Sequence, residues 1–254
     1  MILERDTTLA AALAASPNVG PRQGYGRPDI LLLHYTGMES MANAVDWLTR
    51  AGSGVSCHYA VDEAGSIVQM VPEALRAWHA GDAFWAGETD VNSASVGVEI
   101  HNPGHELGYP EFPEAQLAAV EALCLDIIAR HGIRAERVLG HSDVAPRRKK
   151  DPGEKFPWAR LARAGIGHWV QPVPVAAAEP GLGVGVAGPL VAEVQLMLGR
   201  YGYGIAATGV LDAETEAVVT AFQRHFRPER VDGRIDQSTI WTLERLIADL
   251  PHDC

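Results

Sequence analysis

Cysteine is scarce in this sequence, with three residues in 254: Cys57, Cys124 and Cys254. Their number is odd, their spacing is wide and none forms a C-x-x-C pair, which excludes a disulfide framework and a cysteine zinc site. Long apolar runs are also missing, because no stretch approaches the ~20 apolar residues of a membrane-spanning helix. The remaining composition, 47% apolar and 21% charged, is that of a globular protein with one large domain or two modest ones.

Positive charge is in short supply as well. The chain has 21 Lys and Arg residues against 32 Asp and Glu residues, for a formal net charge of -11. This deficit argues against nucleic acid or an anionic membrane as a partner, because binding to phosphates depends on excess Lys and Arg. The head of the chain, with Glu4, Arg5 and Asp6, lacks the positive charge of a secretory signal. We therefore expect a cytoplasmic location, with a periplasmic or wall-associated one as the alternative.

Short apolar runs alternate with amphipathic segments over the first part of the chain. A period of two indicates strands, and a period of 3.6 indicates helices. Strands are expected at 29–34, 93–102 and 137–140, a β-hairpin at 55–70, and helices at 40–51 and 114–131. This order predicts an α/β fold with a mixed central β-sheet flanked by helices. Residues 1–28, rich in Ala, Pro and Gly, are expected to form a flank on the surface.

A second unit is predicted toward the carboxyl end. The stretch PVPVAAAEPGLGVGVAGP has the composition of a linker. Three helical segments follow it, at 190–200, 212–226 and 236–250. Asp212 is the candidate cap of the second, and either Asp236 or Ser238 is the candidate cap of the third. We therefore expect a catalytic domain over 1–170, a linker over 171–188 and a small all-α three-helix domain over 189–250.

The stretch 140–158, GHSDVAPRRKKDPGEKFPW, is richest in side chains that carry chemistry. Pro146 and Pro152 prevent a helix from running through it, so it is a loop that can hold side chains. Asp151 precedes a proline, which biases its backbone to an extended conformation. His141 and Asp151 can therefore fold back toward one point, and an imidazole with a carboxylate is a ligand pair that zinc accepts.

Further candidates lie at the ends of two predicted strands. Glu99 is in a buried strand, where a carboxylate is costly unless it is paired or catalytic. His34 closes another strand, where a lone histidine is more often structural than a ligand. As ligands, His34, His141 and Asp151 would leave a fourth tetrahedral position for water, as in catalytic zinc sites. Glu99 could then take the proton of that water, and Lys149 could stabilise the oxyanion, which is the chemistry of amide hydrolysis.

The segment HSDVAPRRKKDPGEKFPW closely resembles the zinc-binding signature of the type-2 N-acetylmuramoyl-L-alanine amidases, a family related to the peptidoglycan recognition proteins and phage T7 lysozyme. ILLLH, SCHYAVDEAGSIVQMV, WHAG and SVGVEIHN match the order of the family over roughly residues 28 to 160. The resemblance implies Zn²⁺ on His34, His141 and Asp151, a catalytic Glu99 and a Lys149 that stabilises the transition state. The implied reaction is hydrolysis of the amide between N-acetylmuramic acid and the L-alanine of the stem peptide.

Four further residues are candidate substrate contacts. Trp78 and His79 belong to an aromatic, glycine-containing segment that could stack on a ligand, although packing in the core explains such residues equally well. His58 and Asn102 lie in segments that match the family. For His58 alone, a packed or cross-strand position is the preferred interpretation.

The carboxyl-terminal unit resembles the three-helix peptidoglycan-binding domain of wall hydrolases, through the paired turns GVLDAET and GRIDQST. Peptidoglycan or a muropeptide is therefore the expected partner, and such a module would raise the local concentration of enzyme on a polymeric substrate. A non-catalytic peptidoglycan-recognition protein and a zinc hydrolase of a different amide are the competing hypotheses. The sequence leaves the oligomeric state open.

Overall fold

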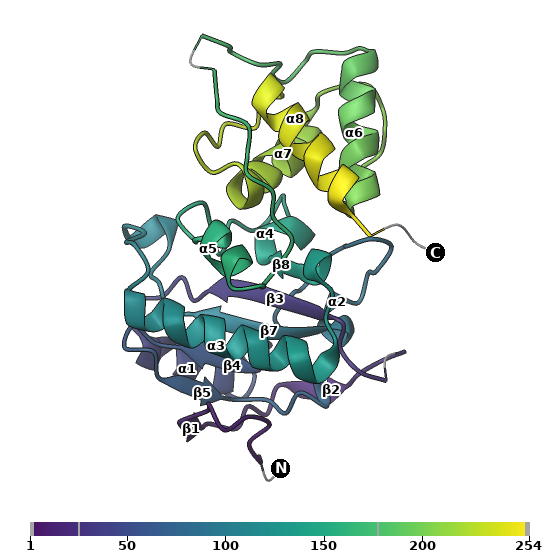
Figure 1. Cartoon of the computed structure of the whole chain (residues 1–254). Helices are drawn as coiled ribbons and strands as arrows, with labels where there is room; N and C mark the ends of the chain where they lie inside the picture. Colours follow the sequence, from purple (N-terminus) through teal and green to yellow (C-terminus); the bar gives the residue numbers. More distant parts are fainter. Residues whose placement is uncertain (1–2, 25, 177, 252–254) are drawn as a thin grey trace.

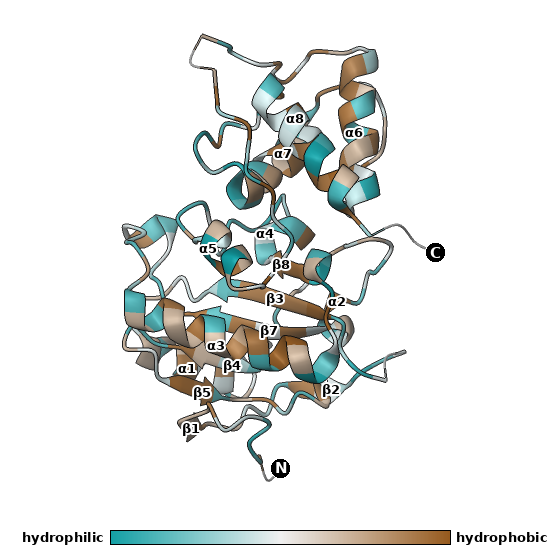
Figure 2. Cartoon of the chain, in the orientation of Figure 1, coloured by the Kyte–Doolittle hydropathy of each residue, from teal (hydrophilic) through white to brown (hydrophobic). Residues whose placement is uncertain are grey.

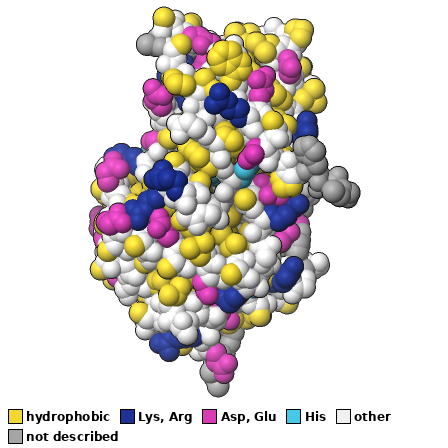
Figure 3. All heavy atoms as spheres, viewed as in Figure 1, with side chains coloured by type: hydrophobic (Ala, Val, Ile, Leu, Met, Phe, Trp, Pro, Cys, Tyr) yellow, Lys and Arg dark blue, Asp and Glu magenta, His cyan; other side chains and the backbone are white. Residues whose placement is uncertain are grey.

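A computed structural model describes residues 3–24, 26–176 and 178–251. Figure 1 shows an α/β unit that holds the amino-terminal part of the chain and a smaller helical unit stacked on it. On the face drawn in Figure 3, basic side chains are interspersed with acidic and apolar ones over both units. Among the described residues, no helix is long and apolar enough to cross a membrane.

The first unit is built on a mixed six-stranded sheet of order β1-β5-β4-β7-β3-β8. Its strands are β1 (Ala12–Leu13), β3 (Ile30–Tyr35), β4 (Tyr59–Val61), β5 (Ile67–Gln69), β7 (Ser95–Ile100) and β8 (Val138–Gly140). Only the β4–β5 pair is antiparallel, which confirms the predicted hairpin. In the parallel pair β3–β7, His34 lies opposite Glu99, and His141 follows directly after β8. The register thus brings three candidate residues to the carboxyl ends of adjacent strands.

Helices cover the sheet as the apolar periodicity predicts. Those of the first unit are α1 (Met41–Thr49), α2 (Val91–Ala94), α3 (Glu114–His131), α4 (His141–Val144) and α5 (Trp158–Arg163), with 3-10 turns at His105–Leu107 and Ala135–Arg137. Leu31 and Leu33 of β3 pack with Leu123 of α3, whereas Ile30 and Leu32 belong to the core of the opposite face. Figure 2 shows the apolar strands β3 and β7 behind the amphipathic α3.

Two expectations need correction. Residues 12–13 and 19–21 lie toward the surface, as expected, but they form strands that were not predicted. Strand β1 pairs with β5, and β2 (Val19–Pro21) pairs with β6 (Leu75–Ala77) in a separate two-stranded sheet. The strand expected at 93–102 begins at Ser95, since Val91–Ala94 form the short helix α2. The Asp90 side chain accepts a hydrogen bond from the Ser93 backbone N–H and so caps this helix.

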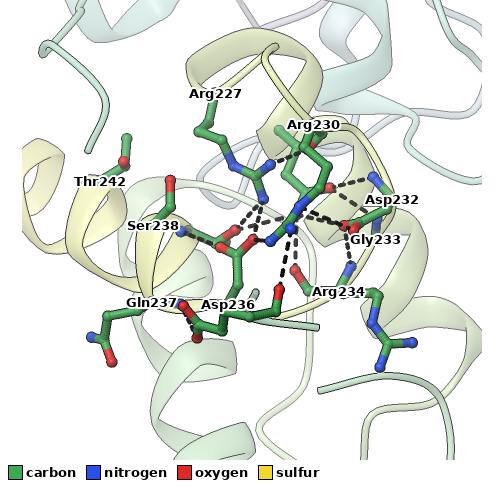
Figure 4. Close-up of polar contacts among 12 residues, drawn as sticks. Arg227, Arg230, Asp232, Gly233, Arg234, Asp236, Gln237, Ser238 and Thr242 are labelled. Atoms are coloured by element: carbon green, nitrogen blue, oxygen red, sulfur yellow. Dashed lines mark hydrogen bonds and ion pairs between the residues drawn. The ribbon is translucent and has the colours of Figure 1, made fainter. Parts of the chain in front are cut away.

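The second unit contains the three predicted helices: α6 (Pro189–Tyr201), α7 (Ala213–Phe226) and α8 (Gln237–Asp249). Asp212 and Asp236 cap α7 and α8, as expected, by accepting from Thr215 and Thr239 backbone N–H groups. At the turn before α8, Asp236 also accepts from two arginines, Arg227 and Arg230, in the network drawn in Figure 4. Part of the stretch expected to be a linker packs on this unit, through β-bridges such as Leu182–Ile235.

The two units share a core. Ile30 and Leu32 of the sheet belong to the same buried cluster as Phe222 of α7. A polar contact reinforces this junction at Asp143 in α4. Its carboxylate accepts a hydrogen bond from the Tyr203 hydroxyl at 2.7 Å and pairs with His225 Nδ1 at 2.7 Å. The second unit is therefore packed directly against the helix that begins with His141.

Candidate metal centre and active site

Three donor atoms converge at the carboxyl end of the sheet. Nδ1 of His34 and Nδ1 of His141 lie 2.9 Å apart, and Oδ2 of Asp151 lies 3.1 Å from the first and 3.0 Å from the second. His34 comes from the end of β3 and His141 from the start of α4. Asp151 is drawn back to them because its carbonyl accepts a hydrogen bond of 2.9 Å from the Ser142 N–H. All three side chains are buried.

This donor set fits a zinc ion. Two imidazole nitrogens and a carboxylate oxygen are ordinary zinc ligands, and zinc bonds of ~2.0–2.2 Å in a tetrahedron place neighbouring donors about 3.3 Å apart. Burial and the adjacent His141 lower the pKa of His34 to about 4, so this ring is neutral at neutral pH. Burial by itself raises the pKa of Asp151, but His141 and His34 outweigh it and hold that pKa below its usual range. Lone pairs thus face one another, an arrangement that a cation stabilises.

Glu99 lies next to the donor set and has a different environment. The residue is half-buried, and its Oε2 atom is buried with no hydrogen-bond partner among the described residues. Burial, followed by the negative charge of Asp151, raises its pKa well above the usual value, and Lys149 opposes this shift. A carboxyl group held in this way can accept and return a proton.

A cavity of about 370 Å³ contains the donor set and opens to solvent. Its size suits a small ligand, since such sites commonly measure ~300–1,000 Å³. The cavity is lined by both polar and apolar side chains. Its lining includes His34, Trp47, Trp78, His79, Glu99, His141, Lys149 and Asp151.

The four predicted substrate contacts divide into two pairs. Trp78 and His79 line the cavity, although His79 is only 8% exposed and its Nδ1 lies 3.1 Å from His34 Nε2. His58 and Asn102 are not among the residues that line it, so their contact with the substrate stays a prediction without support from the cavity. His58 is fully buried with its ring nitrogens on the Gly97 N–H and the Leu75 carbonyl.

Asn102 has a structural explanation of the same kind. It is 2% exposed, its side-chain amide donates to the Pro110 carbonyl, and its side-chain oxygen accepts from the Gly104 N–H. The side chain therefore holds the loop after β7 rather than reaching the cavity. A strand sequence cannot separate this role from ligand binding, because both need a polar side chain at the end of the strand.

Trp47 is a cavity residue that the sequence analysis missed. It lies on α1, is 39% exposed and forms part of the cavity wall. The available signal was its place in the helical pattern: Trp47 lies outside the apolar positions Met41, Ala44 and Leu48. A large aromatic side chain outside the buried stripe of a helix is a candidate contact.

Comparison with known proteins identifies the family of this chain. The profile described as N-acetylmuramoyl-L-alanine amidase matches residues 24–154, more than half of the chain. The chain belongs to this amidase family. A second profile, described as a putative peptidoglycan binding domain, matches residues 187–243. These two matches confirm both resemblances found in the sequence, the second of them for the three-helix unit.

Individual relatives extend over both units. The amidase is 36% identical to N-acetylmuramoyl-L-alanine amidase AmiD of Escherichia coli, with 90% of this chain and 86% of that protein covered. It is 31% identical to 1,6-anhydro-N-acetylmuramyl-L-alanine amidase AmpD of the same species, over 63% of this chain and 95% of that one. AmpD thus corresponds to the first unit alone.

The solved structures that resemble this chain come from the same group of amidases as its sequence relatives. AmiD in complex with anhydro-N-acetylmuramic acid-L-Ala-D-gamma-Glu-L-Lys matches with a TM-score of 0.76 and 35% identity, over 90% of this chain and 92% of that one. AmpDh3 of Pseudomonas aeruginosa, in complex with an anhydromuramic pentapeptide, matches with a TM-score of 0.71 and 30% identity, over 87% and 92%. The predicted α/β fold with a helical second unit is therefore confirmed.

Proposed function

We propose that this amidase is zinc-dependent and hydrolyses the amide between N-acetylmuramic acid and the L-alanine of the stem peptide, with anhydromuropeptides as substrates. The observation that carries the proposal is the convergence of His34, His141 and Asp151 beside a buried carboxyl oxygen of Glu99 that has no partner among the described residues. The substrates named in the solved complexes of AmiD and AmpDh3 support the choice of substrate class. In this account residues 1–170 form the catalytic domain and 189–250 the peptidoglycan-binding domain, joined by 171–188.

The roles of the residues follow from their chemistry. Zinc held by His34, His141 and Asp151 would supply Lewis acidity and lower the pKa of water in the site. Glu99 takes a proton from the attacking water at Oε2 and delivers it to the leaving amine. Its raised pKa suits both halves of this transfer, because the group has to be protonated between the two steps.

Lys149 and the aromatic walls complete the site. The Lys149 ammonium faces the same cavity and stabilises the negative charge that develops on the amide oxygen. Trp47 and Trp78 offer apolar faces against which a sugar ring can pack. The three-helix domain raises the local concentration of the enzyme on wall material.

The test is mass spectrometry of products from a soluble anhydromuropeptide and, in parallel, from purified sacculi. Each reaction is run with untreated enzyme, with enzyme treated with a chelator, and with treated enzyme after addition of zinc. Free stem peptides that disappear on chelation and return with zinc support the proposal. Cleavage at a peptide bond, cleavage insensitive to chelation, or tight binding with no cleavage in zinc-replete protein would each contradict it.

A further inference from the structure

The far sides of both candidate imidazole ligands face one short segment. His34 Nε2 lies 3.1 Å from Nδ1 of His79, and His141 Nε2 lies 3.0 Å from the carbonyl oxygen of Ala80. The segment belongs to neither the sheet nor the loop that supplies the ligands. Two neighbouring residues therefore contact both rings at the nitrogens opposite the metal-facing ones.

The hydroxyl of Ser95 fixes which nitrogen donates in the contact between His79 and His34. The Ser95 hydroxyl donates to the Val91 carbonyl at 2.5 Å, so its oxygen accepts from His79 Nε2 at 3.3 Å. With its proton on Nε2, His79 has a lone pair on Nδ1 that accepts from His34 Nε2. The proton of His34 is thereby held on Nε2, and its Nδ1 lone pair faces His141 and Asp151.

The Ala80 carbonyl gives the same result for His141. A carbonyl oxygen can only accept, so His141 carries its proton on Nε2 and presents an Nδ1 lone pair as well. Both rings are thus fixed in the tautomer that a metal needs. Both acceptors are neutral, so they orient the rings without adding negative charge to the site.

The segment is itself held in place by the surrounding structure. The side-chain oxygen of Asn92 accepts from the backbone N–H groups of His79 and Ala80, each at 2.8 Å. The ring of His79 lies against Gly97 in β7, where an added Cβ would come within 2.6 Å of it. The position of His79 is therefore determined by the fold and not by a ligand.

We propose that His79 and the Ala80 carbonyl are the positioning unit of the metal centre, and that His79 acts on the metal through His34 rather than on the substrate. Partners of this kind are worth ~10–100-fold in metal affinity. The inference rests on the proposed zinc site, but it concerns metal affinity and ring tautomer, both of which are measured without substrate.

The test compares two substitutions of His79 by their zinc dissociation constants, measured by competition with a chromophoric chelator. His79→Leu removes the acceptor and is expected to weaken binding by about 10–100-fold. His79→Gln keeps an acceptor and a donor, and is expected to stay much closer to the wild-type affinity. Equal affinity of the leucine variant and wild type would overturn the inference, as would a glutamine variant as weak as the leucine variant.

A matched control comes from His58, which is also buried and lies beside His79 with ring centroids 5.6 Å apart. Its ring nitrogens contact the Gly97 N–H, the Leu75 carbonyl and the Arg22 guanidinium rather than His34 or His141. His58→Gln is expected to lower the melting temperature and to leave the zinc affinity unchanged. A loss of affinity equal to that of His79→Leu would mean general loosening of the site and would count against the inference.

A spectroscopic readout reports on the tautomer itself. Long-range ¹H–¹⁵N correlation spectra of the zinc-free protein should show His34 as a single tautomer with its proton on Nε2, and a mixture in His79→Leu. If His79→Leu does not fold, Ser95→Ala provides the test. It removes the acceptor of His79 Nε2, together with the donor to the Val91 carbonyl, and should release the tautomers of His79 and His34. An unchanged single tautomer in the folded variant would refute the inference. Failure of wild-type protein to bind zinc would instead refute the metal centre.

Discussion

Two carboxylates with buried oxygen atoms, Glu99 in the first unit and Asp236 in the second, have opposite surroundings. Asp236, before α8, accepts from Arg227 at 3.1 Å and from Arg230, as Figure 4 shows. It also accepts from the Thr239 N–H at 2.7 Å. Burial raises its pKa, but these donors outweigh burial and the pKa stays below the usual value. Glu99 has a buried oxygen with no partner among the described residues, and its pKa lies well above the usual value.

The comparison separates a group that stabilises the fold from one that we propose carries chemistry. At the turn before α8 the chain supplies its own cations, so the charge of the carboxylate is compensated when the protein folds. In the cavity the donor atoms of His34, His141 and Asp151 converge on one another, and none of the described arginine and lysine side chains is hydrogen-bonded to them. We therefore interpret the cluster as a site for an external cation, and Glu99 beside it as the group that exchanges a proton.

The largest expected effect is on turnover. Glu99→Gln keeps the shape of the side chain but removes proton transfer, which is worth ~10²–10⁴-fold in rate. Because a buried oxygen of Glu99 has no partner among the described residues, removing the carboxylate should leave the melting temperature unchanged or raise it. Steady-state kinetics and thermal unfolding of the same preparation check both parts.

Glu106 provides the control for that substitution. It lines the same cavity and pairs with Lys150 at 3.1 Å on the surface. Glu106→Gln is expected to change turnover far less than Glu99→Gln. Similar losses in the two variants would indicate a general requirement for negative charge in the cavity and no special role for Glu99.

The next effect in size is on stability. Asp236→Ala leaves the fully buried Arg227 uncompensated and should lower the free energy of unfolding by ~3–5 kcal/mol. Asp212→Ala removes an equivalent helix cap on α7 that has no arginine partner, and should cost ~1 kcal/mol. Urea unfolding measures both values. Equal losses would show that capping, and not the pairing with arginine, accounts for the role of Asp236.

A smaller effect is expected at the junction of the units. Tyr203→Phe removes a hydrogen bond of 2.7 Å to the buried Asp143, two residues after His141, and should lower the free energy of unfolding by ~1.5–3 kcal/mol. Because α4 begins with His141, zinc affinity should also fall. Tyr201→Phe is the control, since the Tyr201 hydroxyl contacts His168 and not Asp143. If neither variant changes the zinc affinity, the junction between the units does not affect the metal centre.

The last prediction concerns the acid dependence of stability and the buried carboxylate of Glu73. Burial tends to raise its pKa, but His131, Arg130 and Tyr59 lower it from 4.5 to about 2. A carboxylate with a lowered pKa in the folded state contributes stability that is present above pH 4.5 and lost as the pH falls toward about 2.

Unfolding of wild type and Glu73→Gln at several pH values tests this effect. The variant should lose part of the acid dependence of stability over that window. The exposed Glu193→Gln is the control and should keep it. An acid dependence that is identical in wild type and Glu73→Gln would show that Glu73 is not stabilised by its partners.

Elements with a strong local pattern could be predicted from the sequence. Helix α3 was expected over 114–131 because its apolar positions repeat with the helical period and Gly132 follows them; the glycine adopts φ 66° at the carboxyl-terminal cap. The donor set could be predicted because His141 and Asp151 lie in one short segment and resemble a known signature. His34 joined them through the pairing of adjacent parallel strands.

The elements that were missed depend on distant partners. Strand β1 has only two residues and forms by pairing with β5. Strand β2 likewise forms by pairing with β6. The difference between His58 and His79 has the same origin. Both are buried histidines, and only tertiary packing decides that one bonds to backbone groups while the other faces His34. The contact between Asp143 and Tyr203 joins residues 60 positions apart in two units, and no local pattern indicates it.

The most direct test of the central claim is an anomalous difference map, recorded at the zinc absorption edge, from crystals of the protein grown with zinc. The account predicts one strong peak bound by Nδ1 of His34, Nδ1 of His141 and Oδ2 of Asp151 at ~2.0–2.2 Å, with Glu99 beside it and not bound to it. A peak at another place, ligation through Nε2 of either histidine, or no peak in zinc-replete crystals would contradict the account.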